Sequence, residues 1–259
     1  MWRALVCFQV LFFTLNAARA IVGGVNSAQP TPNFLTDTDR QQIKSHTVVI
    51  LNTQDSKHSR CTGTLIEKDL VLTAAHCIPA SLKNLWVVPD IYEFAVMQFR
   101  PVVDVAIDLA NYKTFDLPSQ NKPNYDVALV RFSGDLPAGY TPTKWITSFT
   151  PKENRFWLYV AGYGVSDIDL ADSGELRFSK VTIENFFSTQ SFMVGNQSSG
   201  EGICKGDSGG PAFIKIKDQF FVVGIVSAIQ GGCTGNSFFN QTQFYSDWIA
   251  ENSAKLKSK

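Results

Sequence analysis

The sequence has no long run of like charge and no apolar run of membrane-spanning length. Its 23 basic and 23 acidic residues give a formal net charge of zero. The C-terminal lysines Lys255, Lys257 and Lys259 form its only charge cluster, which is what a solvated helix end requires. Because a membrane-spanning helix needs about 20 apolar residues and nucleic acid needs a basic surface, we predict neither a membrane nor a nucleic-acid partner.

The N-terminal residues 1–20 differ in composition from the rest of the chain. A positively charged start, Met1–Arg3, precedes an almost wholly apolar stretch from Ala4 to Leu15. Ala18-Arg19-Ala20 then matches the A-x-A pattern of a signal-peptidase site. We therefore predict a secretory signal peptide over residues 1–20 and an extracellular domain over residues 21–259.

Cysteine is scarce, with five in the chain, of which Cys7 lies in the predicted leader. The other four are Cys61, Cys77, Cys204 and Cys233. An even number in an exported chain predicts two disulfides, and four cysteines allow three pairings that spacing does not distinguish. Pairing of sequence neighbours would close loops of about 15 to 30 residues, each worth roughly 3 kcal/mol. With no C-x-x-C spacing, we expect no metal site.

Short runs rich in β-branched and aromatic residues recur along the chain, separated by turn residues. We predict strands at His46–Leu51, Thr62–Ile66, Leu70–Thr73, Phe94–Phe99, Val127–Phe132, Phe156–Ala161, Val181–Phe186, Pro211–Ile214 and Phe220–Ser227. Only the tail, Gln243–Lys257, has helical spacing. Leu136–Pro151 has few strand signals and is predicted to connect two halves. The pattern indicates an all-β fold of barrel or sandwich type.

Three separated residues carry the chemistry that the sequence offers. His76 is followed by Cys77, which a disulfide would hold in place, as a general base requires. Asp126 opens an apolar strand, and an aspartate there needs a partner when it is buried. Ser208 lies among small residues in Gly-Asp-Ser-Gly-Gly. A serine hydroxyl becomes reactive only when a base accepts its proton and a third group orients that base.

Four motifs in order along the chain resemble the chymotrypsin/trypsin family of serine proteases. They are Ile21-Val22-Gly23-Gly24, Thr73-Ala74-Ala75-His76-Cys77, Asp126-Val127-Ala128-Leu129 and Gly206-Asp207-Ser208-Gly209-Gly210-Pro211. The resemblance implies two six-stranded antiparallel Greek-key barrels with a C-terminal α-helix. The N-terminal barrel would cover about residues 21–135, the connection about 136–151, and the C-terminal barrel with its helix about 152–259.

The resemblance also implies a secreted serine endopeptidase that hydrolyses protein or peptide substrates through an acyl-enzyme. Ser208 would be the nucleophile, His76 the general base and then acid, and Asp126 the group that orients the base. The N–H groups of Gly206 and Ser208 would form the oxyanion hole. We expect a monomer without cofactor, for which a protein inhibitor is a conceivable partner.

Asp207 lies beside the nucleophile, where a lone buried carboxylate would be costly. By the resemblance, the free amine of Ile21 pairs with it once the leader is removed. Ala20 stands where family members have a basic residue before this isoleucine. We therefore expect signal cleavage itself to create the amine, without a separate activating cut.

The resemblance places a substrate pocket at Gly202, with Ser227, Ala228, Ile229 and Ser237 on its walls. None of these side chains is charged, so a substrate Lys or Arg would be desolvated without a partner. Because Ile229 narrows the entrance, we predict cleavage after small or medium apolar residues. A large aromatic residue is the alternative, since Ala228 replaces the usual aromatic side chain.

A second hypothesis is a catalytically silent homologue that acts as a binding scaffold, because a fold does not determine function. The presence of His76, Asp126 and Ser208 together favours the enzyme. Asn196 and Asn240 also begin glycosylation sequons, a short pattern that occurs by chance in many sequences, and Asn240 lies close to a strand.

Overall fold

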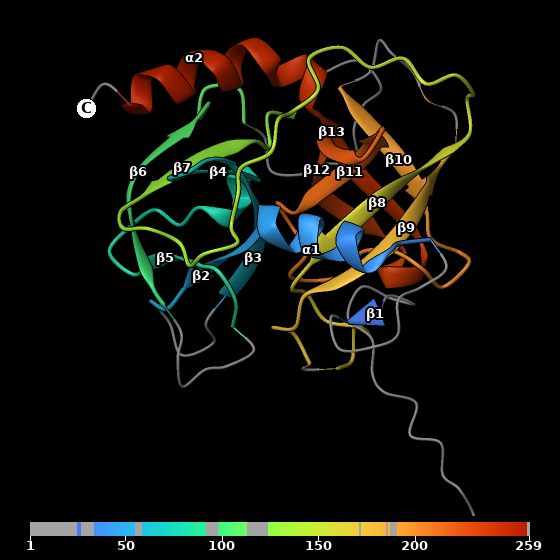
Figure 1. Ribbon diagram of the computed structural model, residues 1–259, viewed down its shortest axis with the longest axis horizontal. Coiled ribbons are helices and arrows are strands. Elements are labelled where there is room, and N and C mark those ends of the chain that lie inside the picture. Colours follow the sequence, from blue (N-terminus) through green and yellow to red (C-terminus); the bar gives the residue numbers. More distant parts are fainter. Residues whose placement is uncertain are drawn as a thin grey trace, which may run out of the picture.

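The computed structural model describes residues 25–26, 34–54, 59–91, 98–112, 124–170, 172–184, 186 and 191–257. The predicted signal peptide, Ile21 and most of the predicted strand Phe94–Phe99 lie outside these ranges. Figure 1 shows two β-barrels side by side, with helix α2 (Ser246–Lys257) along one end of the molecule. No helix in the described ranges is long and apolar enough to cross a membrane.

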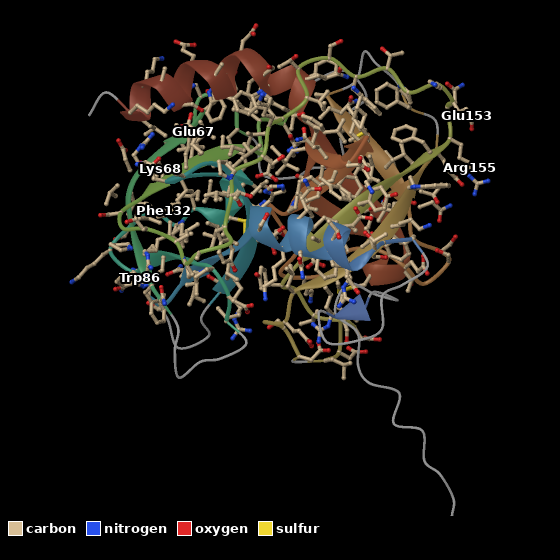
Figure 2. The ribbon with its side chains drawn as sticks, in the orientation of Figure 1. Glu67, Lys68, Trp86, Phe132, Glu153 and Arg155 are labelled. Carbon is tan, nitrogen blue, oxygen red and sulfur yellow. A yellow bond between two sulfur atoms is a disulfide. The ribbon has the colours of Figure 1, made fainter. Side chains whose placement is uncertain are left out.

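Within the described residues, the first barrel closes from six antiparallel strands in the ring order β2-β3-β4-β7-β6-β5. Their bounds are β2 (Thr47–Asn52), β3 (Ser59–Glu67), β4 (Leu70–Thr73), β5 (Leu85–Val88), β6 (Arg100–Ile107) and β7 (Ala128–Phe132). Strand β4 is buried at every position, in keeping with its apolar run Leu70–Leu72, and it ends in the buried Thr73. Helix α2 packs against β6 and β7, and its Lys257 pairs with Glu67 at 2.8 Å, near the helix in Figure 2.

The second barrel has the strand order β9-β10-β13-β12-β11-β8 and is closed by pairing of β8 with β9. Its strands are β8 (Phe156–Gly162), β9 (Arg177–Ile183), β10 (Phe192–Asn196), β11 (Pro211–Ile216), β12 (Gln219–Gln230) and β13 (Asn236–Gln241). The short strand β1 (Val25–Asn26) adds to the outer edge of β9. The fold class expected from the sequence is confirmed.

The prediction that only the tail is helical was wrong, because helix α1 (Asp37–His46) precedes the first barrel. A capping box starts this helix: Asp39 N–H donates to Thr36 Oγ1 at 3.1 Å, and Thr36 N–H donates to Asp39 Oδ2 at 3.1 Å. Thr36-Asp37-Thr38-Asp39 was therefore the missed sequence signal. Helix α1 contacts β2 and β3 of the first barrel and β12 of the second.

Five strands, β1, β5, β6, β10 and β13, were not predicted, and β9 begins four residues before the predicted Val181. Strands β10 and β13 contain asparagine, glycine and glutamine, which disfavour strands in isolation. Pairing along their length holds them in the sheet, with Phe192 opposite Asn240 and Asn196 opposite Asn236. Partners distant in sequence thus override local propensity.

The chain between the barrels, including Leu136–Pro151, makes its own contacts with both. Thr143 N–H donates to Leu65 O at 2.9 Å in the first barrel, and its hydroxyl donates to Phe220 O at 2.7 Å in the second. Further on, Trp145 forms a parallel bridge with Val222. The connection therefore links the barrels through hydrogen bonds as well as through the backbone.

Candidate active site

His76 and Asp126 meet in a dense hydrogen-bonded arrangement at one end of the first barrel. Asp126 Oδ1 accepts the backbone N–H of His76 at 2.9 Å, and Asp126 Oδ2 lies 2.9 Å from His76 Nδ1. The Asp126 side chain is 3% exposed, whereas that of His76 is 34% exposed. Because Nδ1 faces the carboxylate, Nδ1 carries the proton and Nε2 remains as an acceptor on the open side.

The second barrel completes the surroundings of Asp126. Ser227 donates its hydroxyl to Asp126 Oδ2 at 2.6 Å, and Asn240 Nδ2 donates to the Asp126 carbonyl at 2.9 Å. Sequence reasoning placed Ser227 in the substrate pocket, and the structure shows its hydroxyl bonded to the Asp126 carboxylate, a contact that was not predicted. It treated Asn240 only as a sequon residue, whereas this side chain is 1% exposed and hydrogen-bonded within the site.

The turn before Asp126 is strained. Tyr125 has a φ of 50°, a left-handed conformation that is unfavourable for a residue with a β-carbon. Val127 N–H donates to the Tyr125 carbonyl at 2.8 Å, which tightens this turn. The Tyr125 ring packs edge-on against Tyr245, with 5.6 Å between centroids. Packing and backbone bonding thus hold a conformation that aims Asp126 at the histidine.

Two disulfides flank the site and join the cysteines that are neighbours in sequence. Cys61 pairs with Cys77, the residue after His76, with a Cα–Cα distance of 6.0 Å. Cys204 pairs with Cys233, with a Cα–Cα distance of 4.9 Å. The first bridge holds the histidine segment, and the second holds the loop that leads to Ser208.

The Ser208 loop is anchored to the first barrel through its backbone. Thr62 N–H donates to the Ser208 carbonyl at 2.8 Å, and Cys77 Sγ lies 3.6 Å from the same oxygen. The serine therefore lies beside the residue that follows His76. Among the described residues, no hydrogen bond engages the Ser208 hydroxyl or the N–H groups of Gly206 and Ser208. Catalytic hydrogen bonds are commonly loose before substrate binds, so these groups stay available.

The glycines around the serine are needed sterically. Gly209 has a φ of +77°, and a β-carbon there would lie 2.0 Å from Thr73 Oγ1. A β-carbon on Gly210 would lie 2.8 Å from the Asp207 carbonyl. The backbone therefore passes too close to the first barrel for any side chain.

Asp207 is fully buried beneath the nucleophile. Its Oδ1 accepts the N–H of Gly164 at 2.8 Å, and its Oδ2 accepts the N–H of Cys204 at 2.7 Å. Burial raises the pKa of Asp207 to about 7, although these two donors and the nearby Arg177 favour its ionised form. The predicted partner Ile21 lies outside the described residues.

Arg177 is a buried cation near Asp207 that sequence reasoning missed. It is 3% exposed and pairs with Glu175 at 3.3 Å and with Asp172 at 3.5 Å. Burial lowers the pKa of Arg177, while Glu175, Asp172 and Asp207 favour the charged form. A single arginine within a strand pattern gives no sign of burial, so no sequence signal would have identified it.

A side chain that sequence reasoning also missed lies against Gly202, the residue predicted at the base of the substrate pocket. A β-carbon on Gly202 would lie 2.2 Å from Cδ of Gln197, which is fully buried. The Gln197 amide donates to the carbonyls of Ile203 at 3.0 Å and Cys233 at 2.9 Å, and its oxygen accepts Ile203 N–H at 2.8 Å. Ile203, the residue after Gly202, is 1% exposed.

The other predicted pocket residues lie on neighbouring strands. Ile229 on β12 pairs in register with Ser237 on β13, and Ala228 pairs with Phe238. Ile229 packs against the second barrel's core, and Ser237 is fully buried with its hydroxyl donating to Gly195 O at 3.4 Å. The predicted wall residues are thus brought together on adjacent strands.

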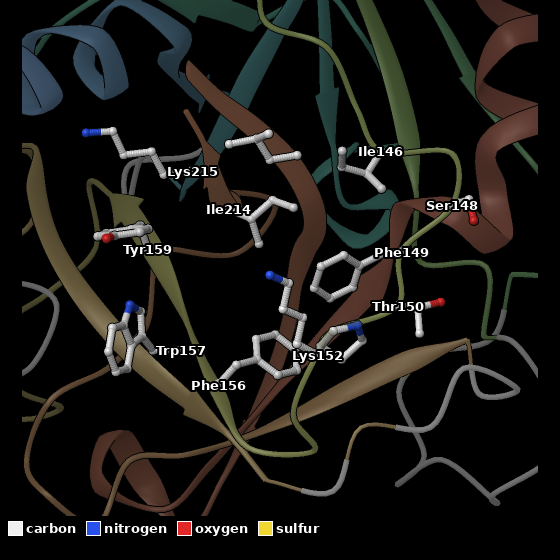
Figure 3. Close-up of a pocket in the computed structure, with 12 residues that line it drawn as sticks. Ile146, Ser148, Phe149, Thr150, Lys152, Phe156, Trp157, Tyr159, Ile214 and Lys215 are labelled. Atoms are coloured by element: carbon white, nitrogen blue, oxygen red, sulfur yellow. The ribbon is translucent and has the colours of Figure 1, made fainter. Parts of the chain in front are cut away.

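A groove of about 550 Å³ lies elsewhere on the second barrel and shares no residue with the site above. Figure 3 shows its lining of aromatic and lysine side chains, which includes Phe149, Lys152, Phe156, Trp157 and Tyr159.

Comparison with known sequences finds similar proteins over most of the chain. The sequence pattern of the trypsin family matches residues 35–249. A collagenase of Hypoderma lineatum is 27% identical over 219 residues, covering 77% of this chain and 78% of the collagenase. A trypsin-like protease of Streptomyces glaucescens is 30% identical over 186 residues, covering 64% of each chain. Bovine (Bos taurus) coagulation factor XI is 25% identical over 77% of this chain, which spans only 34% of that factor.

Two solved structures share the fold. HBP superposes with a TM-score of 0.64 at 24% identity, covering 89% of this chain and 96% of HBP. The scabies mite inactivated protease paralogue S-I1 has a TM-score of 0.64 at 19% identity, covering 83% of this chain and 96% of the paralogue. At these identities the likeness concerns the fold alone.

Proposed function

Because the chain belongs to the trypsin family of serine endopeptidases, we propose that it is a secreted peptidase in which Ser208, His76 and Asp126 form the catalytic triad. The hydrogen bond between His76 Nδ1 and Asp126 Oδ2 carries this proposal. A histidine bound in this way has a fixed ring orientation and tautomer, as a general base for a serine requires. The disulfides suit an oxidising extracellular environment.

The proposed reaction has two halves. Ser208 Oγ attacks the carbonyl carbon of the scissile peptide bond as His76 Nε2 takes the hydroxyl proton. The C–N bond then breaks, His76 returns the proton to the leaving amine, and an ester remains on Ser208. Water, deprotonated by His76, attacks this ester and releases the acid, which restores the serine.

Negative charge builds on the substrate oxygen in both halves. The N–H groups of Gly206 and Ser208 are the proposed donors to this oxyanion. Neither of these two N–H groups has a hydrogen-bond acceptor among the described residues, which supports their proposed role as oxyanion donors. The carboxylate of Asp126 stabilises the positive charge that forms on His76.

The proposed substrate has a small or medium apolar side chain before the scissile bond. Gln197 is fully buried next to Gly202, and no charged side chain is among the predicted pocket residues. A neutral amide offers no partner for lysine or arginine, which would remain charged and desolvated.

Covalent labelling tests the proposed function. The secreted protein should react stoichiometrically with a fluorophosphonate, and Ser208→Ala should abolish the reaction. Ser81→Ala, at an exposed serine of the first barrel, is the matched control and should label normally. Correctly folded protein that does not label would instead support the silent scaffold.

A further inference from the structure

Thr62 on β3 connects the Ser208 loop to the first barrel through hydrogen bonds of both its backbone and its side chain. It is fully buried. Its backbone N–H donates to the Ser208 carbonyl at 2.8 Å, and its own carbonyl accepts the Thr73 hydroxyl at 2.9 Å. Any residue type at position 62 could make these two backbone hydrogen bonds, so they do not explain why the residue is a threonine.

The side-chain hydroxyl makes two further hydrogen bonds, both to the second barrel. Thr62 Oγ1 accepts the backbone N–H of Tyr163 at 3.1 Å and donates to the Gly206 carbonyl at 3.0 Å. The Tyr163 N–H supplies one proton to the oxygen, so the hydroxyl's own proton is directed at Gly206. Hydrogen bonds in such a chain polarise and strengthen one another.

Gly206 is the residue whose orientation most needs control. Its φ is +96°, in a region that glycine enters freely, and it has no side chain to resist rotation. The peptide after it is held at its other end, where Asp207 N–H donates to the Cys204 carbonyl at 3.2 Å. With the Thr62 hydroxyl on the carbonyl, this peptide plane is fixed at both ends.

We propose that the Thr62 hydroxyl is a positioning group for the oxyanion hole, holding the Gly206–Asp207 peptide that lies between the N–H groups of Gly206 and Ser208. The Gly206 N–H itself belongs to the preceding peptide, whose Lys205 carbonyl accepts the N–H of Val165 at 2.8 Å. The inference rests on the proposed function, because it concerns the same reaction. Thr62 itself does not touch the substrate. It acts from the first barrel, so the hole assembles only when both barrels are docked.

The threonine side chain suits this task. A β-branched residue on a strand has few χ1 rotamers, so the hydroxyl is held in place at small entropic cost. A β-carbon on Gly210 would lie 3.1 Å from Thr62 Cβ, which shows how closely the side chain packs against the loop. Serine would keep the hydroxyl without the methyl group, and valine would keep the shape without the hydroxyl.

Steady-state kinetics on a small apolar peptide substrate tests the proposal with Thr62→Val and Thr62→Ser. We expect Thr62→Val to lower kcat on the order of 10-fold or more, since loss of an oxyanion donor lowers it about 100-fold or more. KM should change little, because the ground-state carbonyl depends less on the hole. Thr62→Ser should restore most of kcat. Thr64→Val, at another buried threonine of β3, is the matched control and should leave kcat unchanged.

Each alternative result is decisive. If Thr62→Val keeps wild-type kcat, or if Thr62→Ser is as slow as Thr62→Val, the hydroxyl has no positioning role. If Thr62→Val is not secreted as folded protein, Thr62→Ala is read by the same criteria. Wild-type protein that labels with fluorophosphonate while the Thr62 variants behave normally overturns this inference alone. Wild-type protein that does not label overturns the proposed function.

Discussion

The Ser227 hydroxyl and Asp126 Oδ2 are 2.6 Å apart, and this oxygen also faces His76 Nδ1. The second barrel thus contributes a donor to the carboxylate that orients the histidine of the first. A hydrogen bond to a charged group is worth about 1.5–3 kcal/mol, enough to affect how firmly the carboxylate is held.

Replacing Ser227 therefore should slow the chemical step. Ser227→Ala removes this donor from a buried carboxylate, and we expect kcat to fall about 10-fold or more, with a smaller change in KM. Initial-rate kinetics on a peptide ester and amide would measure both. The control Ser253→Ala, at a buried serine of α2, should leave kcat and KM unchanged. A Ser227→Ala enzyme with unchanged kcat would show that the Ser227 hydroxyl does not help to hold Asp126.

The protonation state of Asp207 should depend on whether the free amine of Ile21 pairs with it. Burial raises its pKa to about 7 among the described residues, so without the amine the folded state binds this proton more tightly than the unfolded chain. A chain with one extra residue before Ile21 should then gain free energy of unfolding as pH falls from about 7 to about 4. Urea unfolding across this range would measure the gain.

The chain that begins at Ile21 should behave differently, because an ammonium partner keeps Asp207 ionised. Its free energy of unfolding should lack this gain at low pH, and its activity should exceed that of the extended chain. Asp207→Asn in the extended chain should remove the pH dependence. Identical pH profiles for the two chains would show that Ile21 does not pair with Asp207.

An aspartate at the pocket floor should not create cleavage after lysine or arginine. The β-carbon of Gly202→Asp would lie 2.2 Å from Gln197 Cδ, so the variant must displace a buried, fully bonded amide. We expect lower thermal stability and no tryptic activity. The double variant Gln197→Ala/Gly202→Asp, which removes the Gln197 amide, is the control. Cleavage after lysine or arginine by Gly202→Asp alone would contradict the conclusion that Gln197 fills the space next to Gly202.

Two glycines with similar backbone conformations should respond differently to alanine. Gly209 (φ +77°) would place its β-carbon 2.0 Å from Thr73 Oγ1, whereas Gly200 (φ +79°) has nothing within 4 Å. Gly200→Ala should cost about 1 kcal/mol through backbone strain alone. Gly209→Ala should cost at least about 2 kcal/mol more, because overpacking is added. Urea midpoints of the two variants would measure the difference, and equal values would contradict it.

The strand pattern predicted an all-β fold, and the short contiguous motifs around His76, Asp126 and Ser208 carried the resemblance that implied the two barrels and the pairing of His76 with Asp126. It did not reveal Gln197, Thr62 or Arg177, whose roles arise only when distant strands meet. Gln197 lies in a loop that reads as polar and exposed, yet its amide is satisfied by three backbone groups. Helix α1 differs from these residues. Its capping box is visible in the sequence and would have predicted the helix.

Asn240 holds the Asp126 carbonyl from the opposite barrel and is also the first residue of a sequon. A glycan on this amide nitrogen would replace one of its two hydrogens, and the side chain is only 1% exposed in the folded protein. If the chain is exported as we propose, sugar transfer at this asparagine and docking of the two barrels would therefore compete. Once the barrels have closed around Asn240, the acceptor is no longer accessible.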